Sequence, residues 1–254
     1  MRYAVEMESS NTTPEGSPHA VAVSAAGPRT LAIDIGGTGL KLLILDHSGQ
    51  PLTERLRVET PRPATPDAVL AELTVLIGQA GHFDRVSVGF PGVVKAGIVH
   101  TAPNLDPSFA EYPLSAELER RTGKPVRVLN DAGVQGHGVI SGRGTELVIT
   151  LGTGMGCALF VDGRYVPNLE LAHHPFKKGR TYEQYVGGAA LEEVGKKKWR
   201  QRVLRVLQQI QPIFNPDHIY IGGGNVKHWK GALPANVTLV ENTAGLLGGI
   251  KLWT

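Results

Sequence analysis

Residues 31–46 read LAIDIGGTGLKLLILD, in which a glycine-rich turn separates two apolar runs. Runs of this length on either side of a glycine turn predict two β-strands, Leu31–Ile35 and Leu40–Leu45, joined as a hairpin. Consecutive glycines have no Cβ to block approach, so their backbone N–H groups can lie close to a phosphate. The pattern therefore predicts either an ordinary hairpin turn or a turn that binds phosphate.

The same pattern returns 116 residues further on, where residues 147–162 read LVITLGTGMGCALFVD. Aligned without a gap, the two stretches share five identities, at Leu31/Leu147, Ile33/Ile149, Gly36/Gly152, Leu43/Leu159 and Asp46/Asp162. The identities are few, but both stretches read as strand, glycine turn and strand. We therefore predict a duplicated α/β protein with an N-terminal tail at residues 1–28, an N-terminal lobe at 29–142 and a C-terminal lobe at 143–254.

The rest of the chain alternates short apolar runs with amphipathic stretches, which is typical of α/β folds. The predicted strands are Val86–Phe90, Val126–Leu129, Glu146–Leu151, Cys157–Val161 and His218–Ile221, with a weak one at Ala20–Ala26. The predicted helices are Pro66–Ala80, Leu114–Arg121, Ala132–Ile140, Leu191–Phe214 (one long helix or a broken one) and Thr243–Ile250. The last strand runs into a third glycine-rich stretch, Gly222–Asn225.

Composition excludes several classes of protein. The chain has 254 residues, of which 41% are hydrophobic, and a net charge of +3 from 26 basic and 23 acidic side chains. This balance gives no argument for a nucleic-acid partner. The single cysteine, Cys157, excludes an internal disulfide framework. Because no apolar run approaches membrane-spanning length and no secretory signal is present, we expect a cytoplasmic protein without a membrane partner.

Two aspartates are candidates for chemistry at the predicted turns. Asp131 follows a predicted strand, and a carboxylate at the carboxyl end of such a strand faces the ligand crevice of an α/β sheet. It could act as a general base, or it could cap the helix that follows. Asp34 opens the first turn, where a carboxylate close to phosphates requires a cation between them. Mg²⁺ held through water would meet that need, and a turn-capping aspartate is the alternative.

The segment 170–187 adds further polar groups. Glu170, His173 and Glu183 suit hydrogen bonds to neighbouring hydroxyls of a sugar, whereas a solvated loop is the plain alternative. Metal binding by His173 and His174 is a third interpretation, but two adjacent histidines without a nearby cysteine make a poor zinc site. Basic clusters at 177–180 and 196–205 form either solvated surfaces or a track for a long anionic phosphoryl donor.

These motifs, in this order, resemble the ROK sugar kinases of the actin-like ATPase clan. The resemblance runs from Leu31 to the C-terminus and rests on Asp-x-Gly-Gly-Thr at 34–38, Gly-Phe-Pro-Gly at 89–92, Pro103-Asn104, Asn130-Asp131, Leu-Gly-Thr-Gly-x-Gly at 151–156 and Gly-Gly-Gly-Asn at 222–225. Within the family the chain is most similar to the polyphosphate glucokinase group. The Gly39-Leu40-Lys41 continuation, the short chain and the lack of a cysteine cluster in 170–187 carry that similarity.

The resemblance implies a two-lobed actin-like ATPase fold, a duplicated ribonuclease H-like unit, with a cleft between the lobes. It implies transfer of a phosphoryl group from polyphosphate, ATP or both to the 6-hydroxyl of glucose, with Mg²⁺ as cofactor, Asp131 as general base and a homodimer as the assembly. It assigns glucose contacts to Asn104, Asn130, Glu170, His173 and Glu183. Donor binding is expected at Asp34, Gly36, Gly37, Thr38, Gly39, Lys41, Gly152, Thr153, Gly154, Gly156, Gly223 and Gly224. The stretch Gly222–Asn225 could bracket an adenosine.

The chain departs from the family at two points. Many relatives fold the 170–187 loop around zinc with one histidine and three cysteines, and with only Cys157 we expect no zinc site here. Ala172 stands where glycine is usual, which affects the geometry of the loop. Three other functions stay open: a kinase for another hexose or an N-acetylated hexose, a sugar-responsive regulator, and a non-catalytic sugar sensor. A regulator of this family carries an N-terminal winged helix. The residues before Leu31 show no helical periodicity, so we expect no such domain in them.

Overall fold

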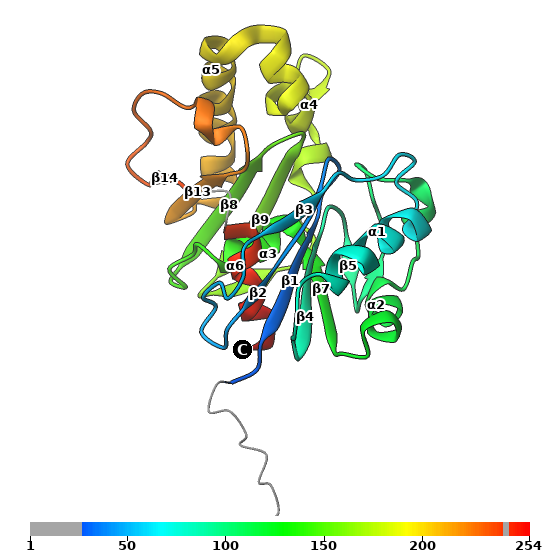
Figure 1. Ribbon diagram of the computed structural model, residues 1–254. Coiled ribbons are helices and arrows are strands. Elements are labelled where there is room, and N and C mark those ends of the chain that lie inside the picture. Colours follow the sequence, from blue (N-terminus) through cyan, green and yellow to red (C-terminus); the bar gives the residue numbers. More distant parts are fainter. Residues whose placement is uncertain (1–26, 241–243) are drawn as a thin grey trace, which may run out of the picture.

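The computed structural model describes residues 27–240 and 244–254. It contains two five-stranded sheets, which form the two lobes (Figure 1). The first sheet has the order β3 (Leu56–Val58), β2 (Leu40–Leu45), β1 (Thr30–Ile35), β4 (Arg85–Phe90) and β7 (Val126–Asn130). The second has the order β10 (Arg164–Val166), β9 (Met155–Val161), β8 (Thr145–Leu151), β13 (His218–Gly222) and β14 (Val237–Leu239). The predicted strand at Ala20–Ala26 lies outside the described residues.

The two sheets have the same topology, which confirms the duplicated, two-lobed α/β fold. In each sheet the second strand of the chain pairs antiparallel with the first, and the two later strands join parallel on the other side. The third strand of each lobe pairs antiparallel at the opposite edge. Both predicted glycine turns therefore connect a central strand to its antiparallel neighbour, at equivalent places in the two lobes.

Strand pairing corrects the gapless alignment of the two hairpins. In the first hairpin Ile35 pairs with Leu40, so four residues form the turn, whereas in the second Leu151 pairs with Met155 across three residues. The opening strands match at a shift of 116 residues, but the returning strands are offset by one. The identities Leu43/Leu159 and Asp46/Asp162 are therefore not structurally equivalent, because a shorter turn shifts every later pairing by one residue.

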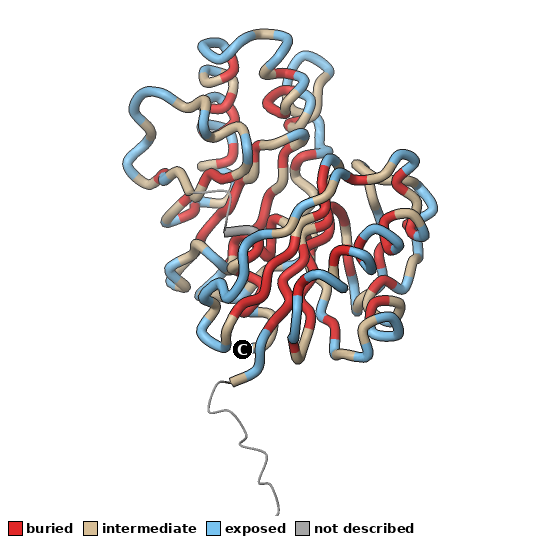
Figure 2. Tube along the Cα trace, viewed as in Figure 1, coloured by how far each residue is buried: buried red, intermediate tan, exposed pale blue. Residues whose placement is uncertain are grey.

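Helices cover the outer faces of both sheets and bury their apolar sides there (Figures 1 and 2). The helices α1 (Pro66–Gly78) and α2 (Leu114–Thr122) pack on the first sheet around Leu70, Leu73 and Leu118. The second sheet is covered by α4 (Tyr182–Val186) and α5 (Gly188–Phe214), with Trp199 fully buried among them. The helix α5 is interrupted at Gly195, where φ is 72°, as the alternative of a broken helix predicted. No helix of the described segments is long and apolar enough to cross a membrane.

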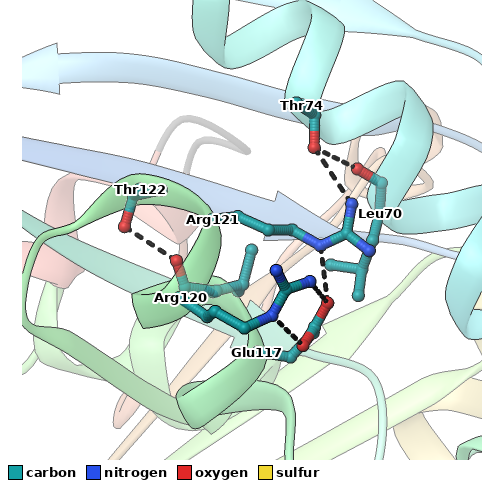
Figure 3. A network of polar contacts seen from close by, with 7 residues as sticks. Leu70, Thr74, Glu117, Arg120, Arg121 and Thr122 are labelled. Atoms are coloured by element: carbon teal, nitrogen blue, oxygen red, sulfur yellow. Dashed lines mark hydrogen bonds and ion pairs between the residues drawn. The ribbon is translucent and has the colours of Figure 1, made fainter.

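A polar network on the outer surface joins α2 to α1 and has no part in the cleft (Figure 3). The Glu117 carboxylate accepts hydrogen bonds from Arg120 and Arg121, which lower its pKa to about 2. Arg121 also reaches Thr74 of α1, whose hydroxyl donates to the Leu70 carbonyl. Because Arg120 is exposed and solvent reaches Glu117 and Arg121, these ion pairs contribute little to stability.

The helix α3 (Asp131–His137) lies between the two sheets and contacts both of them (Figure 1). Such close packing explains its glycines. A Cβ on Gly133 would lie 2.9 Å from the Tyr165 ring, and one on Gly136 would lie 2.3 Å from the Phe160 ring. The helix ends at the Gly138 cap, earlier than the predicted Ile140, and it starts one residue before the predicted Ala132.

The C-terminal segment returns to the first sheet and to α3. It comprises α6 (Ala244–Leu247) and the 3₁₀ helix η4 (Gly248–Trp253), and Leu246 and Ile250 are buried against β1 and β2. The Trp253 indole N–H donates to Ser87 Oγ of β4 at 2.8 Å. The predicted division placed this segment in the lobe 143–254, but its contacts are with the other lobe. Small residues on the inner face of the first sheet, such as Ala32, make room for it. The lobe boundaries 29–142 and 143–254 otherwise stay a prediction.

Short elements complete the connections. They are the hairpins β5 (Val94–Lys95) with β6 (Ile98–Val99) and β11 (Pro175–Lys177) with β12 (Arg180–Thr181), and the 3₁₀ helices η1 (Pro107–Phe109), η2 (Leu171–His173) and η3 (Val226–His228). Asn168, which follows β10, bonds to both backbone groups of Val94, accepting from its N–H at 3.2 Å and donating to its carbonyl at 3.1 Å. This pair of hydrogen bonds ties the second lobe to the first beside the 170–187 loop.

Candidate active site

A cavity of about 630 Å³ is lined by residues of both lobes. Every site residue predicted from the sequence lines it except Gly39. They are Asp131; Asn104, Asn130, Glu170, His173 and Glu183; Asp34, Gly36, Gly37, Thr38 and Lys41; Gly152, Thr153, Gly154 and Gly156; and Gly223 and Gly224. These residues come from a stretch of 191 positions, from Asp34 to Gly224, and the fold brings them to one cavity. The roles predicted for them require this proximity.

The first glycine turn is held from outside by the segment that follows β3. Within the turn the Gly36 N–H donates to the Gly39 carbonyl at 3.1 Å. Thr60 Oγ1 donates to the Gly36 carbonyl, and Arg62 donates to the Gly37 carbonyl. Gly39 lies beneath Arg57, since a Cβ there would approach Arg57 Nε to 3.0 Å. The carbonyls of the turn are therefore satisfied on the outside.

The second turn is braced by the third glycine-rich stretch and by α4. The Asn225 side chain donates to the Gly152 carbonyl at 2.7 Å, and the Asn225 N–H donates to the Leu151 carbonyl at 2.9 Å. On the other side, Glu183 Oε2 accepts from the Met155 N–H at 3.1 Å. A Cβ at position 154 would lie 2.1 Å from that carboxylate oxygen, so a larger residue there would force the Glu183 side chain to move. The turn and Glu183 therefore depend on each other for their positions.

Asp131 is the first residue of α3, and Asn130 provides the helix cap. Asn130 Oδ1 accepts from the N–H groups of Ala132 and Gly133, while Nδ2 donates to the Gly92 carbonyl at 3.1 Å. The capping function that the sequence left open for Asp131 is thus performed mainly by its neighbour, although Asp131 Oδ1 also accepts from the Ala132 N–H. Asn130 keeps one amide N–H for a ligand.

The electrostatic surroundings of Asp131 suit a proton acceptor. Burial and the neighbouring Asp34 carboxylate raise the pKa of Asp131 to about 7, with Glu170 adding to the effect and Lys41 opposing it. A carboxylate with a pKa near the working pH can take a proton from a hydroxyl far better than an ordinary aspartate. Perturbed carboxylates inside a cavity are characteristic of catalytic sites.

This pKa predicts a pH dependence for any reaction in which Asp131 acts as the general base. A general base must be unprotonated, so kcat/KM for a hydroxyl substrate should fall about tenfold per pH unit below about 7 and level off above it. The measurement is direct quantification of product between pH 5.5 and 8.5. A flat profile across this range would show that no group with the pKa of Asp131 governs the reaction.

The loop that follows β10 brings Glu170 and His173 to the cavity together. His173 Nε2 lies 3.5 Å from Glu170 Oε2, and both residues belong to the short turn around the 3₁₀ helix η2. Burial raises the pKa of Glu170. His173 lowers this pKa, and the Glu183 carboxylate raises it further. Ala172 is buried beneath them. Carboxylates, an imidazole and the Asn104 amide together offer the donors and acceptors that recognise a polyhydroxylated ligand.

A magnesium ion fits the side of the cavity that holds the first glycine turn. Asp34 lines it with one carboxylate, and Mg²⁺ binds through one or two carboxylates together with water and substrate phosphates. Lys41 Nζ lies 2.6 Å from Asp34 Oδ2, so the lysine and an ion would share this carboxylate. Within residues 27–240 and 244–254, no group of three or more His, Cys, Asp or Glu side chains is placed to hold a metal. Cys157 is buried in β9, and burial raises its pKa to about 12, so it is unreactive.

The structure also adds cavity residues that sequence reasoning missed. Arg55 lies just before β3 and Arg57 lies within it, and this three-residue strand is too short to show a periodic signal. Lys227 follows the third glycine-rich stretch. Gln135 and Thr150 also line the cavity. The basic clusters at 177–180 and 196–205 do not line it. Within them, Arg180 and Arg202 pair with Glu193 instead.

Comparisons with known proteins identify the family. The profile of the ROK family matches residues 30–167, and the chain belongs to the ROK family. The polyphosphate glucokinase of Mycobacterium leprae (strain TN) is 32% identical over 259 residues, covering 93% of this chain and 78% of that protein. The enzyme class predicted from the sequence, a phosphotransferase with an alcohol acceptor, is thereby confirmed.

Two solved structures resemble the fold. The inorganic polyphosphate/ATP-glucomannokinase from Arthrobacter sp. strain KM has a TM-score of 0.81 and 34% identity, covering 89% of this chain and 98% of that one. A ROK family glucokinase from Streptomyces griseus, in complex with glucose and AMPPNP, has a TM-score of 0.72 at 21% identity, covering 88% and 98% of the two chains. The second supports the actin-like fold alone.

Proposed function

We propose that this protein transfers a phosphoryl group from polyphosphate, ATP or both to the 6-hydroxyl of glucose. The observation that carries the proposal is the position of Asp131. Its carboxylate has a pKa of about 7 and shares one cavity with both glycine turns and with the Glu170–His173 pair. The names of the similar polyphosphate glucokinase and glucomannokinase support this acceptor and these donors.

In the proposed mechanism, Asp131 takes the proton from the sugar hydroxyl as its oxygen attacks the terminal phosphorus of the donor. The bond from that phosphorus to the rest of the donor breaks, and the shortened donor leaves. Asn104, Asn130, Glu170, His173 and Glu183 would hold the sugar. The N–H groups of the two glycine turns would hold the phosphates. A bound Mg²⁺ would supply charge neutralisation on the phosphates, with Asp34 holding it through water.

The experiment that tests the function is product formation with glucose, with ATP and polyphosphate supplied in parallel. Mannose and an N-acetylated hexose serve as further acceptors, because the name of the Arthrobacter enzyme includes mannose as an acceptor. We expect turnover of glucose with at least one donor. If glucose gave no phosphorylated product with any donor while another hexose did, the acceptor would be wrong and the phosphotransferase class would stand.

The basic side chains at the cavity support a donor with many phosphates. Arg55, Arg57 and Lys227 are exposed at its lining. Arg55 and Arg57 are two residues apart, which in an extended segment places them on the same side. Together with Lys227, the two arginines add positive charge to a cavity whose turns already offer backbone N–H groups to phosphate.

Replacing both Arg55 and Arg57 by alanine should raise the KM for polyphosphate about tenfold, since two charge-assisted contacts to phosphate are lost. The effect should shrink as ionic strength rises, because salt screens exposed charges. The matched control replaces Lys197 and Lys198, two exposed lysines on α5 that do not line the cavity. A larger effect in the α5 variant would place the donor track on that helix instead.

A further inference from the structure

The side-chain amide of Gln135 lies beside the cleft without a partner. Gln135 follows Asp131 by four residues on α3, so the two lie on the same side of the helix, one turn apart. The residue is 6% exposed, yet it lines the cavity. Its Nε2 atom is shut off from solvent, and no residue in the described part of the chain accepts a hydrogen bond from it. An unpaired buried amide opposes folding, so its retention calls for a functional reason.

The neighbours of Gln135 belong to the donor side of the cavity. Nε2 packs against the end of β13, where a Cβ on Gly222 would lie only 2.1 Å from it. The next residues, Gly223 and Gly224, line the same cavity. Asn225 then bonds to the Gly152 carbonyl of the second turn. Gln135 therefore lies where the second and third glycine-rich stretches meet, and not in the loop that carries Glu170 and His173.

The orientation of the amide decides which of its atoms faces the cavity. The oxygen and the nitrogen have the same shape and exchange places when the terminal amide rotates by half a turn. After that rotation the oxygen lies against the Cα hydrogens of Gly222, which are weak hydrogen-bond donors. The NH₂ group would then point away from β13 and could donate to a ligand in the cavity that the side chain lines. In this orientation the amide N–H gains a hydrogen-bond partner when a ligand with an acceptor oxygen enters the cleft.

We propose that Gln135 binds the phosphoryl donor, donating its amide N–H to a non-bridging phosphate oxygen. The inference rests on the proposed function, because it takes the donor side of this cleft as the place of a phosphoric anhydride chain. ATP and inorganic polyphosphate share that chemistry, and the amide would serve either one. Gln135 is thereby a residue that binds the phosphoryl donor. It lies on the same helix as Asp131, so the position of the bound phosphoryl donor and the position of Asp131 depend on each other.

The test compares the wild type with Gln135→Met, which keeps the length and volume of the side chain and removes its polar atoms. Binding of ATP and of tripolyphosphate is measured by calorimetry without sugar, so that no turnover occurs. We expect both dissociation constants to rise about tenfold, as for the loss of one hydrogen bond to a charged group. The KM for glucose should stay within twofold. The variant should melt at or above the wild-type temperature, because methionine removes a polar atom that is buried against β13 without a strong hydrogen-bond partner.

Two controls separate a binding role from a structural one. Gln135→Glu keeps the shape but presents a carboxylate to the phosphate, so it should weaken donor binding more than Gln135→Met does. Val134→Ala removes packing from the neighbouring α3 residue, which is buried and does not line the cavity. It should lower the melting temperature and leave donor binding within twofold.

The outcomes distinguish this inference from the function on which it rests. Donor binding within twofold of wild type in Gln135→Met, or a lower melting temperature with equal rises in the KM of sugar and donor, would overturn the role of Gln135. Wild-type protein that binds both donors but phosphorylates no sugar would overturn the proposed function and leave the binding comparison decisive. Wild-type protein that binds neither donor would overturn both.

Discussion

Replacing Asp131 by asparagine should lower kcat for glucose phosphorylation about a thousandfold, within the range of roughly 10²–10⁴ for loss of a general base. Asparagine keeps the shape of the side chain and an oxygen that can still accept from the Ala132 N–H, as Asp131 Oδ1 does. It cannot take the proton of the sugar hydroxyl. The KM values for sugar and donor should change little, because Asp131 contributes to proton transfer more than to ground-state binding. Steady-state kinetics at pH 8 is the measurement.

Stability measurements show whether the loss is chemical. Folding raises the pKa of Asp131 above the value that the same group has in the unfolded chain. The ionised carboxylate therefore lowers the stability of the folded state once the pH exceeds the pKa of the unfolded chain. That penalty is complete above about pH 7, and the amide removes it. The variant should therefore melt at or above the wild-type temperature at pH 8. Asp162→Asn, at an exposed turn residue, is the matched control and should keep full activity. Near-normal activity of Asp131→Asn would exclude it as the base.

Replacing Gly248 by alanine should destabilise the fold by about 3 kcal/mol, at the upper end of the usual cost of overpacking. A Cβ on Gly248 would lie 1.8 Å from the Val134 carbonyl oxygen and 2.8 Å from the Gly138 nitrogen, both in the backbone of α3 or its cap. Backbone atoms cannot move aside as the end of a flexible side chain can. Either α3 shifts or the C-terminal segment leaves the sheet, and both disturb the helix that carries Asp131. The melting temperature should fall by about 6–12 °C.

The control for this variant is Gly78→Ala near the end of α1. A Cβ at Gly78 meets nothing within 4 Å, and its helical backbone favours alanine by about 1 kcal/mol over glycine. This variant should be slightly more stable than wild type, with unchanged kcat. Gly248→Ala should lose kcat as well as stability, measured well below its melting temperature. A Gly248→Ala protein as stable and active as wild type would show that the C-terminal segment does not position α3.

The sequence predicted the central elements because their signals are local. Alternating apolar runs and glycine turns marked β1, β2, β8 and β9, and the ends of β7 and β13 marked the polar residues that follow them. Every candidate site residue that the sequence named lines the cavity except Gly39, although their roles stay predictions. Arg57 escaped prediction, since β3 is too short to show a period. Gln135 escaped because nothing in a helical stretch reveals that one side chain faces a cleft.

What the sequence alone determined is the pair of hairpins, the carboxylate at the end of β7 and the likeness between the two halves of the chain. These are properties of short segments, in which backbone preference and apolar spacing act over a few residues. The tertiary structure decided the one-residue offset between the hairpins, the return of the C-terminal segment to the first sheet and the pKa of Asp131. Each of these depends on groups distant in sequence: Asp34 and Glu170 act on Asp131 only because packing brings three separate segments into one cavity.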